Sequence, residues 1–173
     1  MLSILSIIED TMVDGPGFRT SIYCAGCRHQ CPGCHNPQSW DINEGHAMGT
    51  DDIMRIIEAD PFARGVTFSG GDPMYQPEGF AELACAIRQR TPQKDIWCYT
   101  GFVYEQLLAN PRQRALLEQI DVLVDGPFLR SQRDETLCFR GSRNQRIIDV
   151  QASLARGQVV TLNYTATLAD GGQ

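Results

Sequence analysis

Short apolar runs alternate with longer amphipathic segments along most of the chain. The apolar runs are rich in β-branched and aromatic residues and end at glycine, proline or aspartate, which is typical of buried strands. They occupy residues 18–24, 65–69, 95–99 and 120–124. The segments between them carry apolar residues at helical spacing, which predicts helices over residues 50–58, 77–90 and 104–119, the last with a break at Asn110-Pro111.

This alternation predicts an α/β fold with a parallel sheet and right-handed crossovers. Residues 1–150 contain no repeat, linker or low-complexity tract, so they are expected to form one domain. Residues 151–173 are expected to be a C-terminal extension. Within it, residues 158–164 are expected to add a strand or to contact a partner, and residues 169–173 to form a tail.

Parallel sheets bind their ligands at the carboxyl ends of the strands, so the residues that follow each strand are candidates for a site. Among these segments, the cysteine-rich one carries the most reactive groups. The segments are Cys27 to Asn36, Ser69 to Pro73, Thr100-Gly101 and Asp125-Gly126.

The composition excludes several classes of protein. Hydrophobic residues make up 42% and charged residues 21% of the 173, and no apolar run approaches the roughly 20 residues that a membrane helix requires. The net charge of −6 opposes binding to nucleic acid. The apolar start of the chain has no basic region before it, which argues against a secretory signal. We therefore expect a cytoplasmic protein with no nucleic-acid or membrane partner.

Four of the seven cysteines lie close together, and in a reducing compartment such thiols are more often metal ligands than disulfide partners. Cys27, Cys31 and Cys34 have the spacing Cys-x3-Cys-x2-Cys on a loop rich in glycine and proline, which can curl to bring three thiolates to one centre. A four-iron cluster normally takes four thiolates. Three therefore leave one iron open to a small chelating molecule.

Two other arrangements of these thiols remain open. With Cys24, the loop forms two Cys-x2-Cys pairs, a candidate zinc site, although zinc folds usually place a longer insert between such pairs. The thiols can also be unliganded and structural. Cys24 continues the alternation of the preceding strand and is predicted to face the core, and Cys98 is also predicted to be a core residue.

Several ordered motifs, covering residues 14 to about 150, resemble the radical S-adenosylmethionine superfamily. Their details resemble the activating proteins of anaerobic ribonucleotide reductases. The Cys34-His-Asn36 and Trp40-Asp41 segments also resemble the related pyruvate formate-lyase activating enzymes. The motifs are Asp14-Gly-Pro-Gly17 with Arg19, Gly26 to Cys34, Ser69-Gly-Gly-Asp-Pro73, Asp95-Ile-Trp97 with Thr100-Gly101, Val122 to Gly126, and Arg140-Gly-Ser142 with Asn144-Gln145.

This resemblance implies a partial parallel α/β barrel and a glycyl-radical activating enzyme. A 4Fe-4S cluster on Cys27, Cys31 and Cys34 would cleave S-adenosylmethionine reductively, and the product radical would abstract hydrogen from a glycine of anaerobic ribonucleoside-triphosphate reductase. The implied partners are the large glycyl radical subunit of that reductase and a low-potential electron donor such as flavodoxin. The alternatives are an activase of another glycyl radical enzyme, of the pyruvate formate-lyase type, and a zinc-binding interaction module.

The resemblance also implies which residues hold S-adenosylmethionine. On the cysteine loop, backbone would contact the adenine and an asparagine amide the cofactor carboxylate. After the second predicted strand, a Gly-Gly-Asp segment would accept hydrogen bonds from the methionine amino group, whereas Asp125 would lie near the ribose or a cation, or in a solvated turn. The predicted set is Gly33, Cys34, His35, Asn36, Gly70, Gly71, Asp72 and Asp125.

Two further groups have an open role. His29 and His35 flank the predicted ligands, where they would tune the cluster through hydrogen bonds to sulfur or remain exposed loop residues. A basic stretch would face a partner, steer an anionic ligand or form a solvated surface. It contains Arg130, Arg133, Arg140, Arg143 and Arg146.

Overall fold

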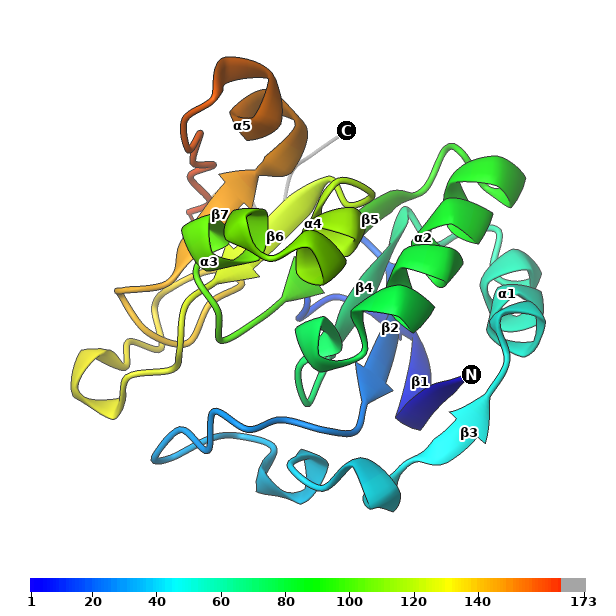
Figure 1. Ribbon diagram of the computed structural model, residues 1–173, viewed down its shortest axis with the longest axis horizontal. Helices are drawn as coiled ribbons and strands as arrows, with labels where there is room; N and C mark the ends of the chain where they lie inside the picture. The colour runs from blue at the N-terminus through cyan, green and yellow to red at the C-terminus, as the bar shows by residue number, and fades with distance from the viewer. Residues whose placement is uncertain (166–173) are drawn as a thin grey trace.

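The computed structural model describes residues 1–165, which form an open mixed sheet flanked by helices (Figure 1). The strands within this range are β1 (Leu2–Thr11), β2 (Arg19–Cys24), β3 (His46–Met48), β4 (Gly65–Gly70), β5 (Asp95–Tyr99), β6 (Val122–Asp125) and β7 (Arg146–Asp149). The α-helices are α1 (Thr50–Ala59), α2 (Pro77–Arg90), α3 (Tyr104–Ala109), α4 (Pro111–Leu117) and α5 (Val150–Arg156). The short 3₁₀ helices are η1 (Pro37–Ser39), η2 (Ile42–Glu44), η3 (Pro73–Tyr75) and η4 (Arg130–Gln132).

The described strands run in the order β3-β1-β2-β4-β5-β6-β7. The central strands β2, β4, β5 and β6 are parallel to one another, which confirms the predicted α/β class. The edges differ from the prediction of a parallel sheet, because β1, β3 and β7 pair in the antiparallel direction. No strand was predicted over residues 2–11, and these residues form the longest strand of the described sheet.

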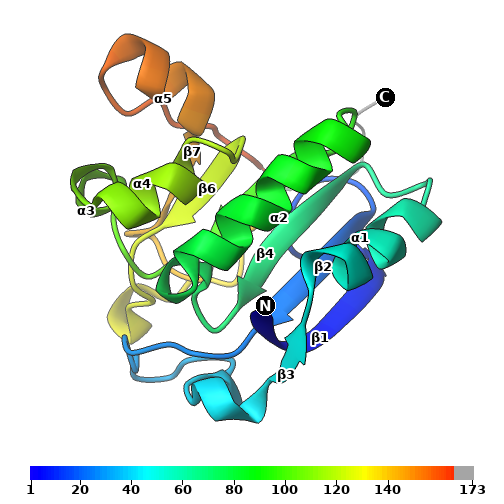
Figure 2. The ribbon, with the colours of Figure 1, turned by 45° about the vertical axis from the view of Figure 1, so that its right-hand side comes forward.

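The helices follow the predicted apolar pattern. Helix α2 buries Phe80, Leu83, Ala84 and Ile87, which lie on one face at helical spacing. Helices α1, α2 and α4 lie side by side along one face of the sheet (Figure 2). Full burial of each large apolar side chain contributes roughly 1.5–3 kcal/mol, so this layer stabilises the strands whose ends form the site.

The opposite face of the sheet carries a second, smaller apolar cluster. Trp97 and Val124 are buried there, and the rings of Phe139 and Tyr164 pack against Trp97 with centroids 5.6 Å away. Both faces of the central strands are therefore covered, as is typical of parallel sheets, and β2 and β4 also bury polar side chains, among them Arg19 and Thr67.

Of the two expectations for residues 158–164, the strand is wrong, because this segment pairs with β7 only through a single bridge between Ile148 and Thr161. Two backbone hydrogen bonds support that bridge, from Asp149 to Val160 and from Leu162 to Ile147. The tail predicted for residues 169–173 lies outside the described residues. Within the part of the chain that the structure describes, no helix has the length and apolar character needed to cross a membrane.

Candidate functional site

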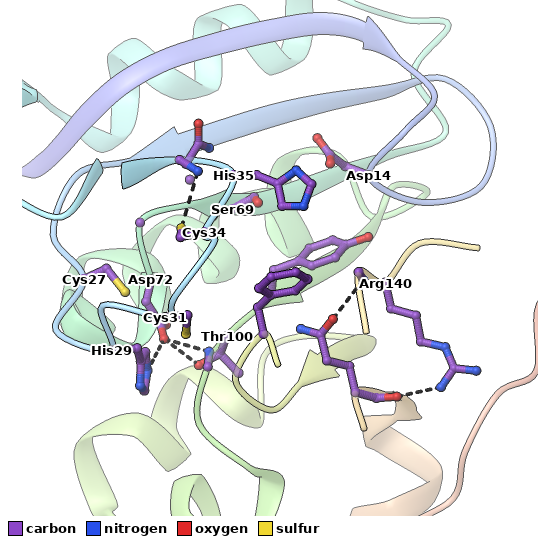
Figure 3. A pocket seen from close by; sticks show the side chains of 18 of the residues that line it. Asp14, Cys27, His29, Cys31, Cys34, His35, Ser69, Asp72, Thr100 and Arg140 are labelled. Atoms are coloured by element: carbon purple, nitrogen blue, oxygen red, sulfur yellow. Dashed lines mark hydrogen bonds and ion pairs between the residues drawn. The ribbon is translucent and has the colours of Figure 1, made fainter. Parts of the chain in front are cut away.

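A pocket opens at the carboxyl ends of the parallel strands, where the sequence predicted a ligand site (Figure 3). Its volume is about 540 Å³, within the roughly 300–1,000 Å³ typical of small-molecule sites. On one side lies the cysteine wall, formed by residues 27–36, within the cysteine loop that follows β2 (residues 25–40), and by the strand end at residues 69–72. Across from it lies the facing wall, formed by residues 126–145.

The three predicted cluster ligands, Cys27, Cys31 and Cys34, all line the pocket. Each is a partly exposed free thiol. Burial raises the pKa of the Cys27 thiol to about 11, so ligation there would displace a proton. Within residues 1–165, no three His, Cys, Asp or Glu side chains are grouped closely enough to hold a single ion. A four-iron cluster is larger and separates its thiolates further, so three thiols on one wall fit such a cluster.

Cys24 does not belong to this thiol group. It lies on β2, is fully buried and does not line the pocket, which confirms the prediction that it faces the core. Burial raises the pKa of this thiol further than that of Cys27. Its position therefore argues against a zinc site made from all four cysteines. Cys98 is buried as well, as predicted.

Backbone hydrogen bonds hold the base of the cysteine loop. The Gly71 amide donates to the Cys24 carbonyl at 2.7 Å, and the Asp72 amide donates to the Gly26 carbonyl at 2.9 Å. The returning arm of the loop is also bonded, since the Gly26 amide donates to the Ser39 carbonyl at 2.8 Å. The loop is thus joined at its base to the end of β4.

This close approach explains the two glycines at the end of β4. Gly70 has a φ of +97°, and a Cβ there would lie 2.6 Å from the Cys24 amide nitrogen. A Cβ on Gly71 would lie 2.6 Å from the Gly26 carbonyl oxygen. Both contacts are with backbone, which cannot move aside as a side chain does. The glycine pair therefore has a structural role in this chain, besides the predicted contact with cofactor.

Most of the predicted cofactor residues line the pocket, but not all. Cys34, His35 and Asn36 lie on the cysteine wall, and the Gly70-Gly71-Asp72 segment lies at the end of β4. Gly33 does not line the pocket; its φ of +80° needs a glycine, and a Cβ there would contact Phe128 and Arg130 at 3.5 Å.

For Asp125, the structure excludes the solvated turn, and the predicted contact with the ribose or a cation stays a prediction. Asp125 is only 1% exposed, so it does not lie in a solvated turn, and it does not line the pocket. The Arg146 guanidinium donates to both carboxylate oxygens, at 3.0 and 2.5 Å, and the Tyr104 amide donates to Oδ2 at 2.8 Å. Its partners are therefore protein groups, which join β6 to β7 and to the start of α3.

The Asp14-Gly-Pro-Gly17 turn enters the pocket, and the buried Arg19 holds it there. The Arg19 side chain donates to the Pro16 carbonyl at 3.3 Å, to the Thr67 hydroxyl at 2.8 Å and to the Asp95 carboxylate at 2.5 Å. The Thr67 hydroxyl in turn donates to the Asp14 carbonyl at 2.9 Å. This network explains why an arginine follows the turn by two residues.

Asp14 and Tyr23 form a pair in the pocket to which the sequence assigned no role. The Tyr23 hydroxyl donates to the Asp14 carboxylate. Burial, then the hydrogen bond to this carboxylate, raises the pKa of Tyr23. The motif that begins at Asp14 marks the first member of this pair. The local sequence pattern gives no sign that Asp14 bonds to Tyr23 on the next strand.

The facing wall is held by the side chain of Gln145. Its Oε1 accepts from the amides of Gly141 and Ser142 at 2.9 and 3.1 Å, and its Nε2 donates to the Gly126 carbonyl at 3.0 Å. Arg140 lines the pocket and donates to the Gln145 carbonyl at 2.6 Å. These contacts account for the motif over residues 140–145. They also place Arg140, unlike Arg146, at the ligand site.

Comparison with known proteins agrees with this site. A family model described as a 4Fe-4S single cluster domain matches residues 13–148, which span both walls of the pocket. The thiol-lined pocket and the match define the class as an iron–sulfur protein with one four-iron cluster.

Curated relatives narrow this class to one family. The anaerobic ribonucleoside-triphosphate reductase-activating protein of Vibrio cholerae serotype O1 is 42% identical over 142 residues, covering 79% of this chain and 90% of the relative. The protein of the same name from Escherichia coli K12 is 37% identical, covering 78% and 90%. That of Enterobacteria phage T4 is 32% identical, covering 78% and 86%. The chain therefore belongs to the family of anaerobic ribonucleoside-triphosphate reductase-activating proteins.

Proposed function

We propose that the chain is a radical S-adenosylmethionine enzyme that forms a glycyl radical on the large subunit of an anaerobic ribonucleoside-triphosphate reductase. When bound, a 4Fe-4S cluster supplies one electron to S-adenosylmethionine, whose sulfonium bond breaks to give methionine and a 5′-deoxyadenosyl radical. That radical would take a hydrogen atom from a glycine α-carbon, which would leave 5′-deoxyadenosine and the glycyl radical. The electron comes to the cluster from an external low-potential donor such as flavodoxin. We place this reaction in the cytoplasm.

The observation that carries the proposal is the convergence of two segments distant in the sequence. The cysteine loop and the Gly70-Gly71 strand end meet in one pocket, and the loop carries three thiols there. Three thiolates leave one iron of a four-iron cluster open, and the partly exposed Gly70-Gly71 segment in the same pocket offers backbone acceptors that suit a chelating amino acid. The names of the relatives support the reductase as the protein that is activated.

We assign the cluster to Cys27, Cys31 and Cys34, and the cofactor to the groups around them. The carbonyls of the Gly70-Gly71 segment would accept hydrogen bonds from the methionine amino group, because a cationic amine shielded from water needs acceptors. Asp72 would add a negative charge to this side of the pocket. The backbone near Cys34 and the Asn36 amide would contact the adenine and the cofactor carboxylate.

The open sheet around the site suits a protein substrate. We propose that the open sheet of residues 1–150 is the partial barrel of this enzyme class, with residues 151–173 as an extension. An incomplete barrel leaves room for a loop of a large protein to reach the pocket. Exposed apolar side chains at the turn between β1 and β2 support a protein substrate, since Met12, Val13 and Phe18 are about half exposed or more and Val13 lines the pocket.

Removing single thiols tests the cluster assignment. The wild-type protein, purified and reconstituted without oxygen, is expected to hold about four irons and, once reduced, to release 5′-deoxyadenosine from S-adenosylmethionine. Cys27→Ala, Cys31→Ala and Cys34→Ala should each lose both properties. Cys24→Ala and Cys85→Ala are matched controls that should keep them.

Two outcomes would contradict the proposal. One is a colourless wild-type protein that binds zinc and loses it in Cys24→Ala, which supports the interaction module instead. The other is an iron-loaded, reduced protein that cleaves no S-adenosylmethionine.

A further inference from the structure

The cysteine loop is bonded at its base by backbone, and a histidine side chain bonds its tip to the rest of the described chain. Residues 28–35 contain Cys31 and Cys34, and within the described chain one hydrogen bond ties this segment to residues outside the loop. That bond joins His29 Nε2 to Asp72 Oδ2 at 2.9 Å (Figure 3). Since Asp72 is a carboxylate that accepts, the ring nitrogen donates.

Asp72 is a fixed anchor for this bond. It is 1% exposed, and its Oδ2 also accepts from the Thr100 hydroxyl at 2.9 Å and the Gly101 amide at 3.0 Å. Its Oδ1 accepts from the Met74 amide at 2.9 Å. The carboxylate is therefore held from the end of β5 and from η3 before it meets His29. A buried group with this many fixed partners has little freedom to move.

A socket of aromatic rings and a glycine holds the imidazole. The His29 ring packs edge-on against Phe102, with centroids 4.6 Å apart, and lies 5.5 Å from the ring of Tyr75. A Cβ on Gly101 would lie only 2.5 Å from the His29 ring, so the ring occupies space that only a glycine leaves open. The side chain is 17% exposed. The histidine is thus bound by shape as well as by its hydrogen bond.

We propose that His29 is a positioning residue that latches the tip of the cysteine loop to Asp72 and so sets where Cys27 and Cys31, two residues to either side, present their thiolates. This inference rests on the proposed assignment of the cluster to these cysteines. It differs from the tuning role that the sequence suggested, because Nε2 is bonded to a carboxylate rather than to sulfur. Outer groups that orient metal ligands commonly change metal affinity by about 10–100-fold.

Hydrogen exchange of the apoprotein tests the latch without a cluster. In His29→Ala, the Cys34 amide, which donates to the Cys31 carbonyl, and the Asn36 amide, which donates to Cys34 Sγ, are expected to exchange at least about tenfold faster than in wild type. The amides of α2 serve as the internal control and should be unchanged. His29→Gln keeps a side-chain N–H that can reach Asp72 and should recover part of the protection. His46→Ala, an exposed histidine on β3, is the matched control and should behave as wild type.

The loaded protein gives a second readout that a merely structural role would not change. His29→Ala is expected to release iron to a chelator about tenfold faster than wild type and to show a broader electron paramagnetic resonance spectrum of the reduced cluster. Unchanged loop exchange in His29→Ala, or the absence of any recovery in His29→Gln, would overturn the latch. A wild-type protein that binds no cluster would overturn the proposed function, while the exchange experiment would still decide the latch.

Discussion

The cysteine wall and the facing wall enclose the same pocket but are built in different ways. The cysteine wall is held by backbone hydrogen bonds of 2.7–2.9 Å and by the buried Asp72. The facing wall also has internal hydrogen bonds, but its ion pairs lie in solvent, with the Arg133 and Arg143 side chains 52% and 71% exposed. Exposed ion pairs contribute only about 0–1 kcal/mol. The base of the cysteine wall is therefore fixed by backbone hydrogen bonds, whereas the facing wall depends on side-chain hydrogen bonds and on exposed ion pairs.

The largest loss in the free energy of unfolding is expected when one carbon atom is added to the cysteine wall. In Gly71→Ala, the new Cβ would lie 2.6 Å from the Gly26 carbonyl oxygen and 3.0 Å from the Ser39 carbonyl oxygen. Neither backbone atom can yield without moving the loop, so we expect a loss of about 3 kcal/mol in the free energy of unfolding. Urea denaturation and the iron content after reconstitution measure the effect.

Gly49→Ala is the matched control for that change. Gly49 has no left-handed φ, and a Cβ there would lie an ordinary 3.5 Å from the Asp52 carboxylate. Gly49 is the N-cap of α1, where alanine is less favourable than glycine, so the loss in the free energy of unfolding should stay below about 1 kcal/mol. Equal losses in the free energy of unfolding for Gly71→Ala and Gly49→Ala would show that the close approach of Gly71 to the loop backbone does not fix the cysteine wall.

Asp125 and Arg146 lie behind the facing wall and give the next largest effect. Arg146→Met leaves a buried carboxylate without its cation, and since Arg146 is about one third exposed we expect a loss of about 2 kcal/mol. In Asp125→Asn the amide keeps an acceptor for the Tyr104 amide, so the loss should be smaller. Thermal unfolding of the two single variants and of the double variant gives the coupling energy. A weakened affinity for S-adenosylmethionine in Asp125→Asn, at unchanged stability, would instead restore Asp125 as a cofactor ligand.

On the facing wall, the backbone conformation of Phe139 can be tested by substitution. Its φ is +57°, a left-handed conformation that side chains adopt at a cost, and its ring packs against Trp97. Both Phe139→Ala and Phe139→Gly lose the ring, but glycine accepts this backbone freely. We therefore expect Phe139→Gly to be about 1 kcal/mol more stable than Phe139→Ala in denaturant titrations. The reverse order would mean that the wall has no such backbone constraint.

The smallest expected effect is the pH response of the exposed ion pairs. Hydrogen bonds from the Thr136 hydroxyl and amide, then from Arg143, lower the pKa of Asp134 to about 2. The unfolded chain has an ordinary value near 3.9, so Asp134 stabilises the fold above about pH 4, and this contribution is lost as the pH falls toward 2. In Asp134→Asn, that part of the acid dependence should disappear from unfolding curves between pH 4 and 2. An unchanged curve would contradict the assignment.

Much of the cysteine wall could be predicted from the sequence because its signals are local. The spacing of Cys27, Cys31 and Cys34 and the glycines at the end of β4 lie in short segments, and the rule for parallel strands brings those segments together. The helix over residues 77–90 and the strand over residues 95–99 also have the predicted bounds. In both of these elements, the apolar pattern of the segment itself shows which side chains are buried.

The parts that were missed depend on contacts between distant residues. Strand β1 has few buried positions beyond its first residues, so its pattern is not that of a core strand. The pairing of Asp14 with Tyr23 and the partners of Asp125 arise only once the strands are side by side. The socket of His29 likewise combines three segments, around Tyr75, Gly101 and the loop tip. No local periodicity reports such contacts.

Formation of a glycyl radical on the reductase is the direct test of the proposed activity. The reconstituted chain, S-adenosylmethionine and a reductant are mixed without oxygen with the large subunit of an anaerobic ribonucleoside-triphosphate reductase, and the glycyl radical is recorded by electron paramagnetic resonance. We predict a radical signal on the reductase that is absent with Cys31→Ala and absent when pyruvate formate-lyase replaces the reductase. No signal on the reductase while S-adenosylmethionine is cleaved, or a signal on pyruvate formate-lyase instead, would contradict the account.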